Sequence, residues 1–256
     1  MAYFERVSAT SFRPTEHVSG GWNTAEQHIA PPMGLLAHLV ETHRDERRDD
    51  ALRLARLSYD ILGTLPMDTV DVEVEVLRPG RTIELVEARL RHAGRVGLTL
   101  RAWLLDQRDT APHAGTAFAP IPPVNAMPEW DPRSVWPGGF IASTRVRRIQ
   151  RAPGDATYWV RSDVPLLDDE PVGPVASAAR LLDIANGITA RHHPSVAAFP
   201  NLDLTAHLFR APVGEWLGFD TRVSTGHLGA GLTESVVHDA DGPLGTVSQI
   251  QTVRPR

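Results

Sequence analysis

The feature that most constrains the fold is an internal repeat. Residues 56–62, Arg-Leu-Ser-Tyr-Asp-Ile-Leu, can be laid on residues 203–209, Asp-Leu-Thr-Ala-His-Leu-Phe, and a proline follows shortly after each segment. Further on, Gly-Arg-Val-Gly at 94–97 matches Gly-Pro-Leu-Gly at 242–245. We therefore predict an α+β chain made of two copies of one unit, each an antiparallel sheet wrapped around a long central helix with its own core. Joined edge to edge, the two sheets would form one pseudo-dimer.

In the first half, the spacing of apolar residues changes along the chain. The first dozen residues predict a strand that ends at Pro14, and residues 17–28, rich in Gly, Trp and Asn, predict a loop. Two prolines then open a segment with leucines at helical spacing, which predicts a helix over 31–44 because proline suits the first helical turn. The charged run 44–50 predicts a solvated connection. Alternation with period two then predicts four strands, near 55–61, 70–76, 83–92 and 96–105.

The second half repeats this plan after a proline-rich stretch. Seven prolines between residues 107 and 139 predict an extended linker. We expect a helix from Pro174 that stops where Gly187 takes a left-handed cap. The predicted strands cover 140–148, 157–164, 202–210, 216–223, 229–238 and 244–253, with a hairpin turn at 241–242. The predicted domains are 1–106, the linker 107–139, and 140–256.

Composition excludes several classes of protein. Without cysteine the chain has no disulfide, thiolate nucleophile or thiolate metal site. A net charge of -5 with scattered basic residues argues against a nucleic-acid partner. There is no apolar run long enough for a membrane helix, and the N-terminus does not read as a signal peptide. We expect a cytoplasmic protein with a small-molecule partner, no membrane association, and no metal or cofactor.

One predicted strand carries polar residues where a core strand would not. In the stretch 201–212, the alternation of a strand puts Asp203, Thr205 and His207 on one face and three apolar residues on the other. Such groups are costly to bury unless they are paired or used. Two interpretations stay open at this point: the polar face meets water, or it belongs to a site.

The chain resembles the double-hotdog acyl-CoA thioesterases over nearly its whole length, and is similar to bacterial thioesterase II and its actinobacterial relatives. The resemblance rests on FRPTEHVSGGWNTAEQHIAPPMGLLAHLVE, VEVEVLRPGR, LLDIANGI, NLDLTAHLFRAPVGEWLGFD and DGPLGTVSQIQTVRPR. It implies a tandem hotdog fold, a role in lipid metabolism, and the hydrolysis of acyl-CoA or acyl-pantetheine thioesters to an acid and a thiol by an activated water.

The resemblance also implies catalytic residues. In this family an Asp, a Gln and a Ser or Thr of the C-terminal half hold and activate the water. Carried over to this sequence, they are Asp203, Gln249 and either Ser224, which we slightly favour, or Thr225. Gln251 stays as an alternative to Gln249.

The internal overlay limits the number of sites. It sets Arg56 opposite Asp203 and Arg101 opposite Gln249. Neither arginine can act as a general base near neutral pH. We therefore expect one catalytic site per chain.

Substrate-binding residues are expected at the start of the first predicted helix, at the end of the second and on the polar strand. The family entrance His-Gly-Gly-Pro reads His-Ile-Ala-Pro at 28–31 here, and free N–H groups near 30–34 would receive the oxyanion. His28 is otherwise a local hydrogen-bonding residue, and a helix cap explains the Asn-Gly pair at 186–187 equally well. A paired histidine at 192–193 lacks a third metal ligand. The candidates are His28, Ala30, Gly34, Asn186, Gly187 and His207.

Two other functions remain open. A hotdog hydratase acting on enoyl thioesters would pair Asp203 with His207, although its usual Asp-x-Asn-Pro-x-His segment is absent. A non-catalytic acyl-CoA binding module is supported only by the altered entrance at Ile29 and Ala30. We also expect a homo-dimer or higher homo-oligomer, because the edge strands of such sheets need covering.

Overall fold

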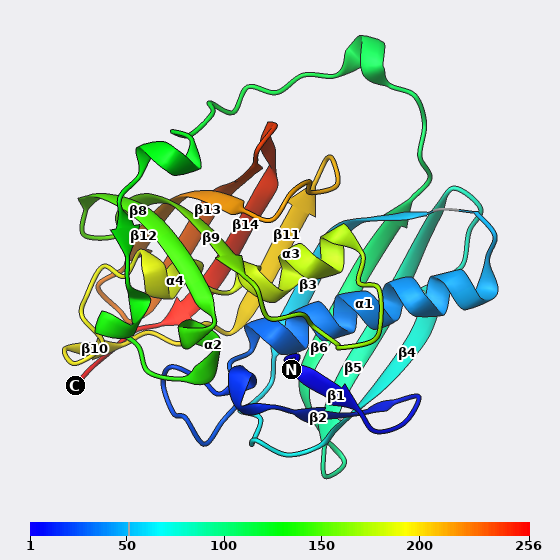
Figure 1. The fold of residues 1–256 in the computed structure, drawn as a ribbon, viewed down its shortest axis with the longest axis horizontal. Coiled ribbons are helices and arrows are strands. Elements are labelled where there is room, and N and C mark those ends of the chain that lie inside the picture. Colours follow the sequence, from blue (N-terminus) through cyan, green and yellow to red (C-terminus); the bar gives the residue numbers. More distant parts are fainter. Residues whose placement is uncertain (51) are drawn as a thin grey trace.

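The computed structural model describes residues 1–50 and 52–256. In this part of the chain, thirteen strands form one sheet that runs through both halves (Figure 1). Neighbouring strands of the sheet pair antiparallel.

The first half follows the predicted order, with one difference at its start. The predicted helix and four strands are confirmed, with ends shifted by at most three residues. The single N-terminal strand is wrong: two short strands form a hairpin, because the Ser8 hydroxyl accepts the backbone N–H groups of Thr10 and Ser11 and so fixes a turn between them. The elements are β1 (Phe4–Arg6), β2 (Ser11–Pro14), η1 (Glu16–Val18), α1 (Ala30–Arg47), β3 (Arg53–Ile61), β4 (Val70–Arg78), β5 (Ile83–His92) and β6 (Arg95–Leu105).

In the second half the six predicted strands are present, while the helix differs. It breaks after Leu182 into two short helices, and Gly187 lies inside the second of them without a positive φ, so the predicted left-handed cap is wrong. The elements are β8 (Thr144–Ala152), β9 (Asp155–Ser162), α3 (Pro174–Leu182), α4 (Ala185–Ile188), β10 (Ala197–Ala198), β11 (Asp203–Leu208), β12 (Leu217–Thr225), β13 (Ala230–Asp239), β14 (Gly242–Thr252) and β15 (Arg254–Pro255).

The proline-rich stretch leaves the sheet and returns to it. Figure 1 shows it arching outside the sheet from the end of β6 to the far side of the second half. It carries η2 (Ala111–His113), η3 (Val124–Ala126), β7 (Glu129–Trp130) and η4 (Pro132–Ser134). Residues 139–142, partly predicted as strand, form α2 (Gly139–Ala142). Gly139 allows this turn to approach the N-terminal segment, since a Cβ there would lie 2.0 Å from the Glu16 carbonyl oxygen.

The two halves meet at β3 and β11, where the repeat determines the pairing. Ser58 and Thr205, which the overlay matches to each other, are direct partners across the junction, and their hydroxyl oxygens lie 3.0 Å apart. The pairing of the neighbouring strands β6 and β14 shifts one match of the predicted sequence overlay, Arg101 with Gln249, by one residue. Arg101 pairs with Ser58 as Ser248 pairs with Thr205, so the counterpart of Gln249 is Ala102. Across the whole sheet the strand order is β1-β2-β4-β5-β6-β3-β11-β14-β13-β12-β9-β8-β7. Read outward from the junction, each of the six strands of the first half has a counterpart in the second half, where β7 is added at the outer edge.

The core is shared between the halves. Helices α1 and α3 pack against each other, and the buried apolar residues of both halves form one continuous cluster. The expectation of two long helices with separate cores is therefore wrong. The expectation that the sheets join edge to edge is confirmed. No helix in the described ranges has both the length and the apolar character needed to cross a membrane.

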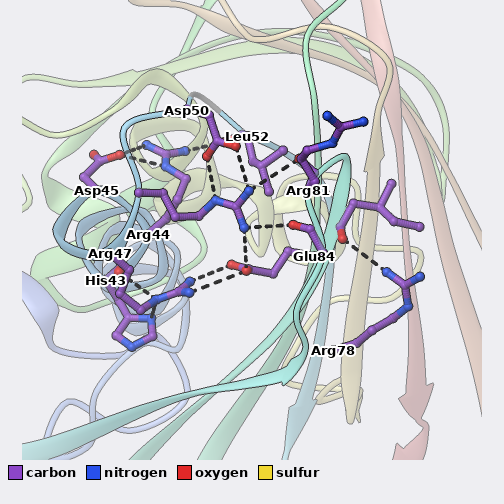
Figure 2. A network of polar contacts seen from close by, with 12 residues as sticks. His43, Arg44, Asp45, Arg47, Asp50, Leu52, Arg78, Arg81 and Glu84 are labelled. Atoms are coloured by element: carbon purple, nitrogen blue, oxygen red, sulfur yellow. Dashed lines mark hydrogen bonds and ion pairs between the residues drawn. The ribbon is translucent and has the colours of Figure 1, made fainter.

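Ion pairs hold the C-terminal end of α1 in place. The charged run 44–50 had instead predicted a solvated connection. Figure 2 shows Arg47 pointing toward Glu84 of β5, whose side chain is fully buried, and Arg48 forms a second ion pair with the same carboxylate. The Arg47 Nη2–Glu84 Oε1 distance is 2.6 Å, and Arg48 Nη1 lies 3.1 Å from Oε2. Arg44 also donates to the carbonyl of Leu52 at 2.6 Å. These contacts tie the helix end to the sheet.

A substitution at the crossing of α1 and α3 tests the shared core. A Cβ on Gly34 would lie 2.6 Å from the Cβ of Arg180 and 3.0 Å from its Cα. We expect Gly34→Ala to lower the free energy of unfolding by about 1–3 kcal/mol, because overpacking outweighs the better helix propensity of alanine. Urea unfolding followed by circular dichroism measures this change.

The matched control is Gly115→Ala, where no atom lies within 4 Å of the added Cβ. It should change the stability by less than about 0.5 kcal/mol. A Gly34→Ala protein as stable as the parent would show that the two helices are not held in this close contact.

Candidate active site

A buried carboxylate lies at the break between α3 and α4. The side chain of Asp183 is 5% exposed, and its Oδ1 accepts two hydrogen bonds of 2.7 Å each, from Asn201 Nδ2 and Gln249 Nε2. Asn201 comes just before β11, and Gln249 projects from the helix-facing side of β14, where it is also buried. Three segments far apart in the sequence thus form one polar cluster, Asp183, Asn201 and Gln249.

The environment changes the acidity of this group. Burial raises the pKa of Asp183 to about 7, and the hydrogen bonds from Asn201 and Gln249 only partly oppose the shift. Two neutral amides replace less of the solvation of a carboxylate than water supplies, which is why burial dominates. Near neutral pH, Asp183 can therefore both lose and accept a proton.

His28 faces the same carboxylate and is neutral. Its Nδ1 lies 3.9 Å from Asp183 Oδ2 and accepts a hydrogen bond of 3.2 Å from the backbone N–H of Ala30. The ring packs at 4.1 Å, between centroids, from that of Phe140. Burial lowers the pKa of His28 to about 3. Because Nδ1 is the acceptor, the proton of the neutral ring is on Nε2, which makes that nitrogen a donor.

These groups line a cavity. It has a volume of about 540 Å³, and its wall includes His28, Asp183, Asn186 and Asn201. Apolar side chains of the segment 61–65 line another side. A smaller adjoining hollow of about 30 Å³ shares His28, Asp183 and Asn186 and adds Gly187 and aromatic rings. The structure thus brings together three of the predicted binding residues, His28, Asn186 and Gly187.

Asp203 lies on the other face of the sheet. Its partner position on β14 is that of Ile250, one residue after Gln249, so the two side chains point to opposite sides. The Asp203 Oδ1 accepts the backbone N–H of Ile250 at 2.6 Å. His207 is exposed on the same outer face. The predicted alternation of β11 is confirmed, but its polar face is turned away from the cavity.

The remaining predicted catalytic residues also lie apart from Asp183. On β12, Ser224 is exposed and Thr225 lines a separate hollow of about 10 Å³. Gln251 lines that same hollow and donates to the carbonyl of Phe199 at 3.4 Å. No Ser or Thr hydroxyl among the described residues is hydrogen-bonded to Asp183; the side-chain amide of Asn201 takes that place.

The start of α1 offers fewer donors than the sequence suggested. The N–H of Ala30 is bound to His28, the next two residues are prolines, and Met33 donates to the carbonyl of Ile29 at 3.0 Å. Gly34 packs against α3 and does not line the cavity. Free N–H groups are therefore scarce at this helix start, and an anionic oxygen in the cavity would depend on side-chain donors.

The sequence reasoning missed Asp183 and Asn201, although both lie in segments quoted for the resemblance. Asp183 stands between Leu-Leu and Ile-Ala, the only charged residue of an apolar stretch over 181–185. A lone carboxylate in such a segment is a signal of a buried functional charge. Its partners could not be named, because they come from strands whose facing was unknown.

Two family models match the chain. The acyl-CoA thioesterase N-terminal domain matches residues 18–105, and the acyl-CoA thioesterase C-terminal domain matches residues 116–253. Among curated protein sequences, none matches the chain.

Solved structures show the same fold. A conserved protein of unknown function with a hot dog fold from Alicyclobacillus acidocaldarius is 16% identical, with a TM-score of 0.77 over 97% of this chain and 95% of that one. The acyl-CoA thioesterase II TesB2 of Mycobacterium marinum is 18% identical, with a TM-score of 0.70 over 99% and 96%. The tesB protein of Mycobacterium avium subs paratuberculosis is 17% identical, with a TM-score of 0.68 over 98% and 96%. At these identities the similarity shows a hotdog fold.

The raised pKa of Asp183 predicts a pH-dependent stability. Between the unfolded value of 3.8 and the folded value of about 7, the folded state binds one proton more than the unfolded chain. This group therefore lowers the free energy of unfolding as pH rises through that window, by at most about 1.4 kcal/mol per pH unit. Asp183→Asn removes this term and should gain stability relative to the parent between pH 4 and 7, by a few kcal/mol in total.

Urea midpoints of both proteins at pH 4.5, 6 and 8 measure the difference. Asp203→Asn, at an aspartate outside the cavity, is the control and should show no such gain toward pH 8. A stability difference between Asp183→Asn and the parent that stays constant across the range would show that the carboxyl is not buried as described.

Proposed function

The chain belongs to the acyl-CoA thioesterase family, and we propose that this thioester hydrolase uses Asp183 as the base that activates the attacking water. The observation that carries the proposal is a carboxylate with a pKa near 7 at the wall of a cavity, with one oxygen held by two amides. The expectation from the resemblance was Asp203. We place the base at Asp183 because Asp203 faces the outer side of the sheet.

The two oxygens of the Asp183 carboxyl group have different surroundings, and this difference supports the proposed role. Asn201 and Gln249 occupy Oδ1 and fix the plane of the group. Oδ2 is left facing His28 and the cavity. A water bound at Oδ2 would give up one proton to it while its oxygen forms the new bond to the thioester carbonyl carbon. A base whose pKa matches the working pH is the most effective for this transfer.

His28 suits the opposite task. The residue lines the cavity, and its neutral ring carries its proton on Nε2 while Nδ1 is held by Ala30, so it can donate to the carbonyl oxygen as negative charge develops there. A protonated imidazole would instead attract and neutralise the Asp183 carboxylate. Burial, which lowers the pKa of His28, keeps the two groups in complementary states.

The tetrahedral intermediate then collapses by breaking the carbon–sulfur bond. The proton held on Asp183 passes to the leaving thiolate, which regenerates the carboxylate. The acid product ionises by releasing its own proton to solvent. No group other than water and the thioester is consumed.

We also propose that the chain is a tandem of two hotdog units, 1–106 and 140–256, joined by the linker 107–139. The mirrored strand order and the Ser58–Thr205 pairing support this division. The counterparts of Asn201 and Gln249 in the first unit are Leu54 and Ala102, both fully buried apolar residues. One water-activating site per chain follows. A homo-oligomer and a cytoplasmic location stay predictions.

The rival functions receive less support from the geometry. The hydratase pair, Asp203 and His207, lies on the face of β11 away from the cavity. A module that only binds acyl-CoA has no need of a buried carboxylate with a raised pKa, which costs stability at neutral pH.

Substitutions should separate the two aspartates. We expect Asp183→Asn to lower kcat about 10²- to 10⁴-fold, because the amide keeps the shape but cannot accept a proton. Gln249→Ala should lower kcat by a smaller factor, and Asp203→Asn should stay close to the parent. Release of thiol from acyl-CoAs, from acetyl to palmitoyl, followed with a thiol-trapping dye, measures all three.

Because Asp183→Asn is expected to be at least as stable as the parent at pH 7.5, loss of its activity cannot be ascribed to unfolding. If Asp183→Asn kept near-full turnover while Asp203→Asn lost it, the base would be Asp203, and the assignment to Asp183 would fail.

A further inference from the structure

Two arginines near the C-terminus line the same cavity as Asp183. Arg254 and Arg256 are both exposed, whereas the catalytic carboxyl is buried. Their backbone is held in place: Arg254 pairs with Ala198 across the two short strands β15 and β10, and the N–H of Arg256 donates to the carbonyl of Val196 at 3.0 Å. The cavity therefore runs from a buried carboxyl to a cationic rim.

The charges of this rim are not neutralised. Within the described residues, no ion pair involves Arg254 or Arg256, in contrast to Arg161, which is paired with Glu215 at 2.7 Å. The acidic residues among those lining the cavity are Glu26 and the buried Asp183. The rim thus carries an excess of positive charge on a chain whose net charge is -5.

An aromatic ring is part of the same rim. The guanidinium carbon of Arg256 lies 5.5 Å from the ring of Trp22, which is 40% exposed. The indole is held edge-on against Trp136 and Phe199, with centroids 4.7 and 5.1 Å away. A fixed ring next to a guanidinium restrains the long arginine side chain and leaves apolar surface open to a ligand.

Building on the proposed hydrolysis, we propose that Arg254 and Arg256 form the subsite that binds the phosphate groups of coenzyme A. The planar guanidinium matches the geometry of a phosphate and remains charged at every working pH. The thioester reaches Asp183 through the cavity while the anionic nucleotide stays at the rim. A polyanion approaching a negatively charged protein needs such a local positive field.

A second kind of substrate could also bring negative charge to this rim, namely an acidic carrier protein with an acylated phosphopantetheine arm. The cavity rim favours the free nucleotide, because Trp22 adds an exposed ring beside the cations on which an adenine can stack. The carrier-bound substrate is therefore one arm of the test.

The test compares the parent, Arg254→Ala/Arg256→Ala and the control Arg95→Ala, an exposed arginine in the β5–β6 hairpin. The substrates are one acyl group on coenzyme A, on dephospho-coenzyme A, on a carrier protein and on N-acetylcysteamine. We expect the double variant to raise KM for acyl-CoA about tenfold with kcat unchanged, as loss of two exposed ionic contacts implies. The N-acetylcysteamine thioester should be hydrolysed equally by all three proteins.

Salt gives a second readout without substitution. Raising the ionic strength should raise KM of the parent for acyl-CoA and leave that for the uncharged thioester constant. An equal KM of parent and double variant for acyl-CoA would overturn the proposal, and so would an effect confined to the carrier-bound substrate. If the parent hydrolysed none of the thioesters, the proposed function would fail, and calorimetric binding of coenzyme A to parent and double variant would still decide the role of the two arginines.

Discussion

The burial of one carboxylate, that of Asp183, is the constraint on which the rest of the site depends. Removing it from water raises its pKa to about 7, and the cost is tolerable only because Asn201 and Gln249 both donate to Oδ1. Those two donors come from the segment before β11 and from β14, so the pairing of these strands fixes the position of the Asp183 carboxyl group. The break between α3 and α4 falls at the same residue and brings its side chain to the cavity.

Much of the fold could be predicted from the sequence. Alternating apolar and polar residues indicated the strands, and matching segments in the two halves indicated the repeat. The overlay even identified Ser58 and Thr205, which become partners at the junction of the two halves. The second helix could not be predicted in the same way. Its break at Asp183 is stabilised by hydrogen bonds from residues 18 and 66 positions away along the chain, which no local propensity contains.

The site was predicted less well than the fold, for a related reason. Alternation correctly separated Asp203 from its apolar neighbours, but it could not say which face of β11 meets the helices. Among the predicted site residues, His28, Asn186 and Gly187 line the cavity or its adjoining hollow, and Gln249 is hydrogen-bonded to Asp183. Gly34 proved to be a contact between helices. The two halves share one architecture and differ in chemistry, since Leu54 and Ala102 fill in the first half the positions of Asn201 and Gln249.

The central claim, that Asp183 titrates near neutral pH, can be measured directly. Carbon-13 NMR of protein labelled at the aspartate carboxyl carbons follows each group during a pH titration, and comparison with Asp183→Asn assigns its resonance. The account predicts that this resonance alone disappears in the variant and titrates with a midpoint near 7 in the parent. If the Asp183 resonance titrated below pH 5, its carboxyl would be solvated, and the assignment of Asp183 as a base tuned by burial would be contradicted.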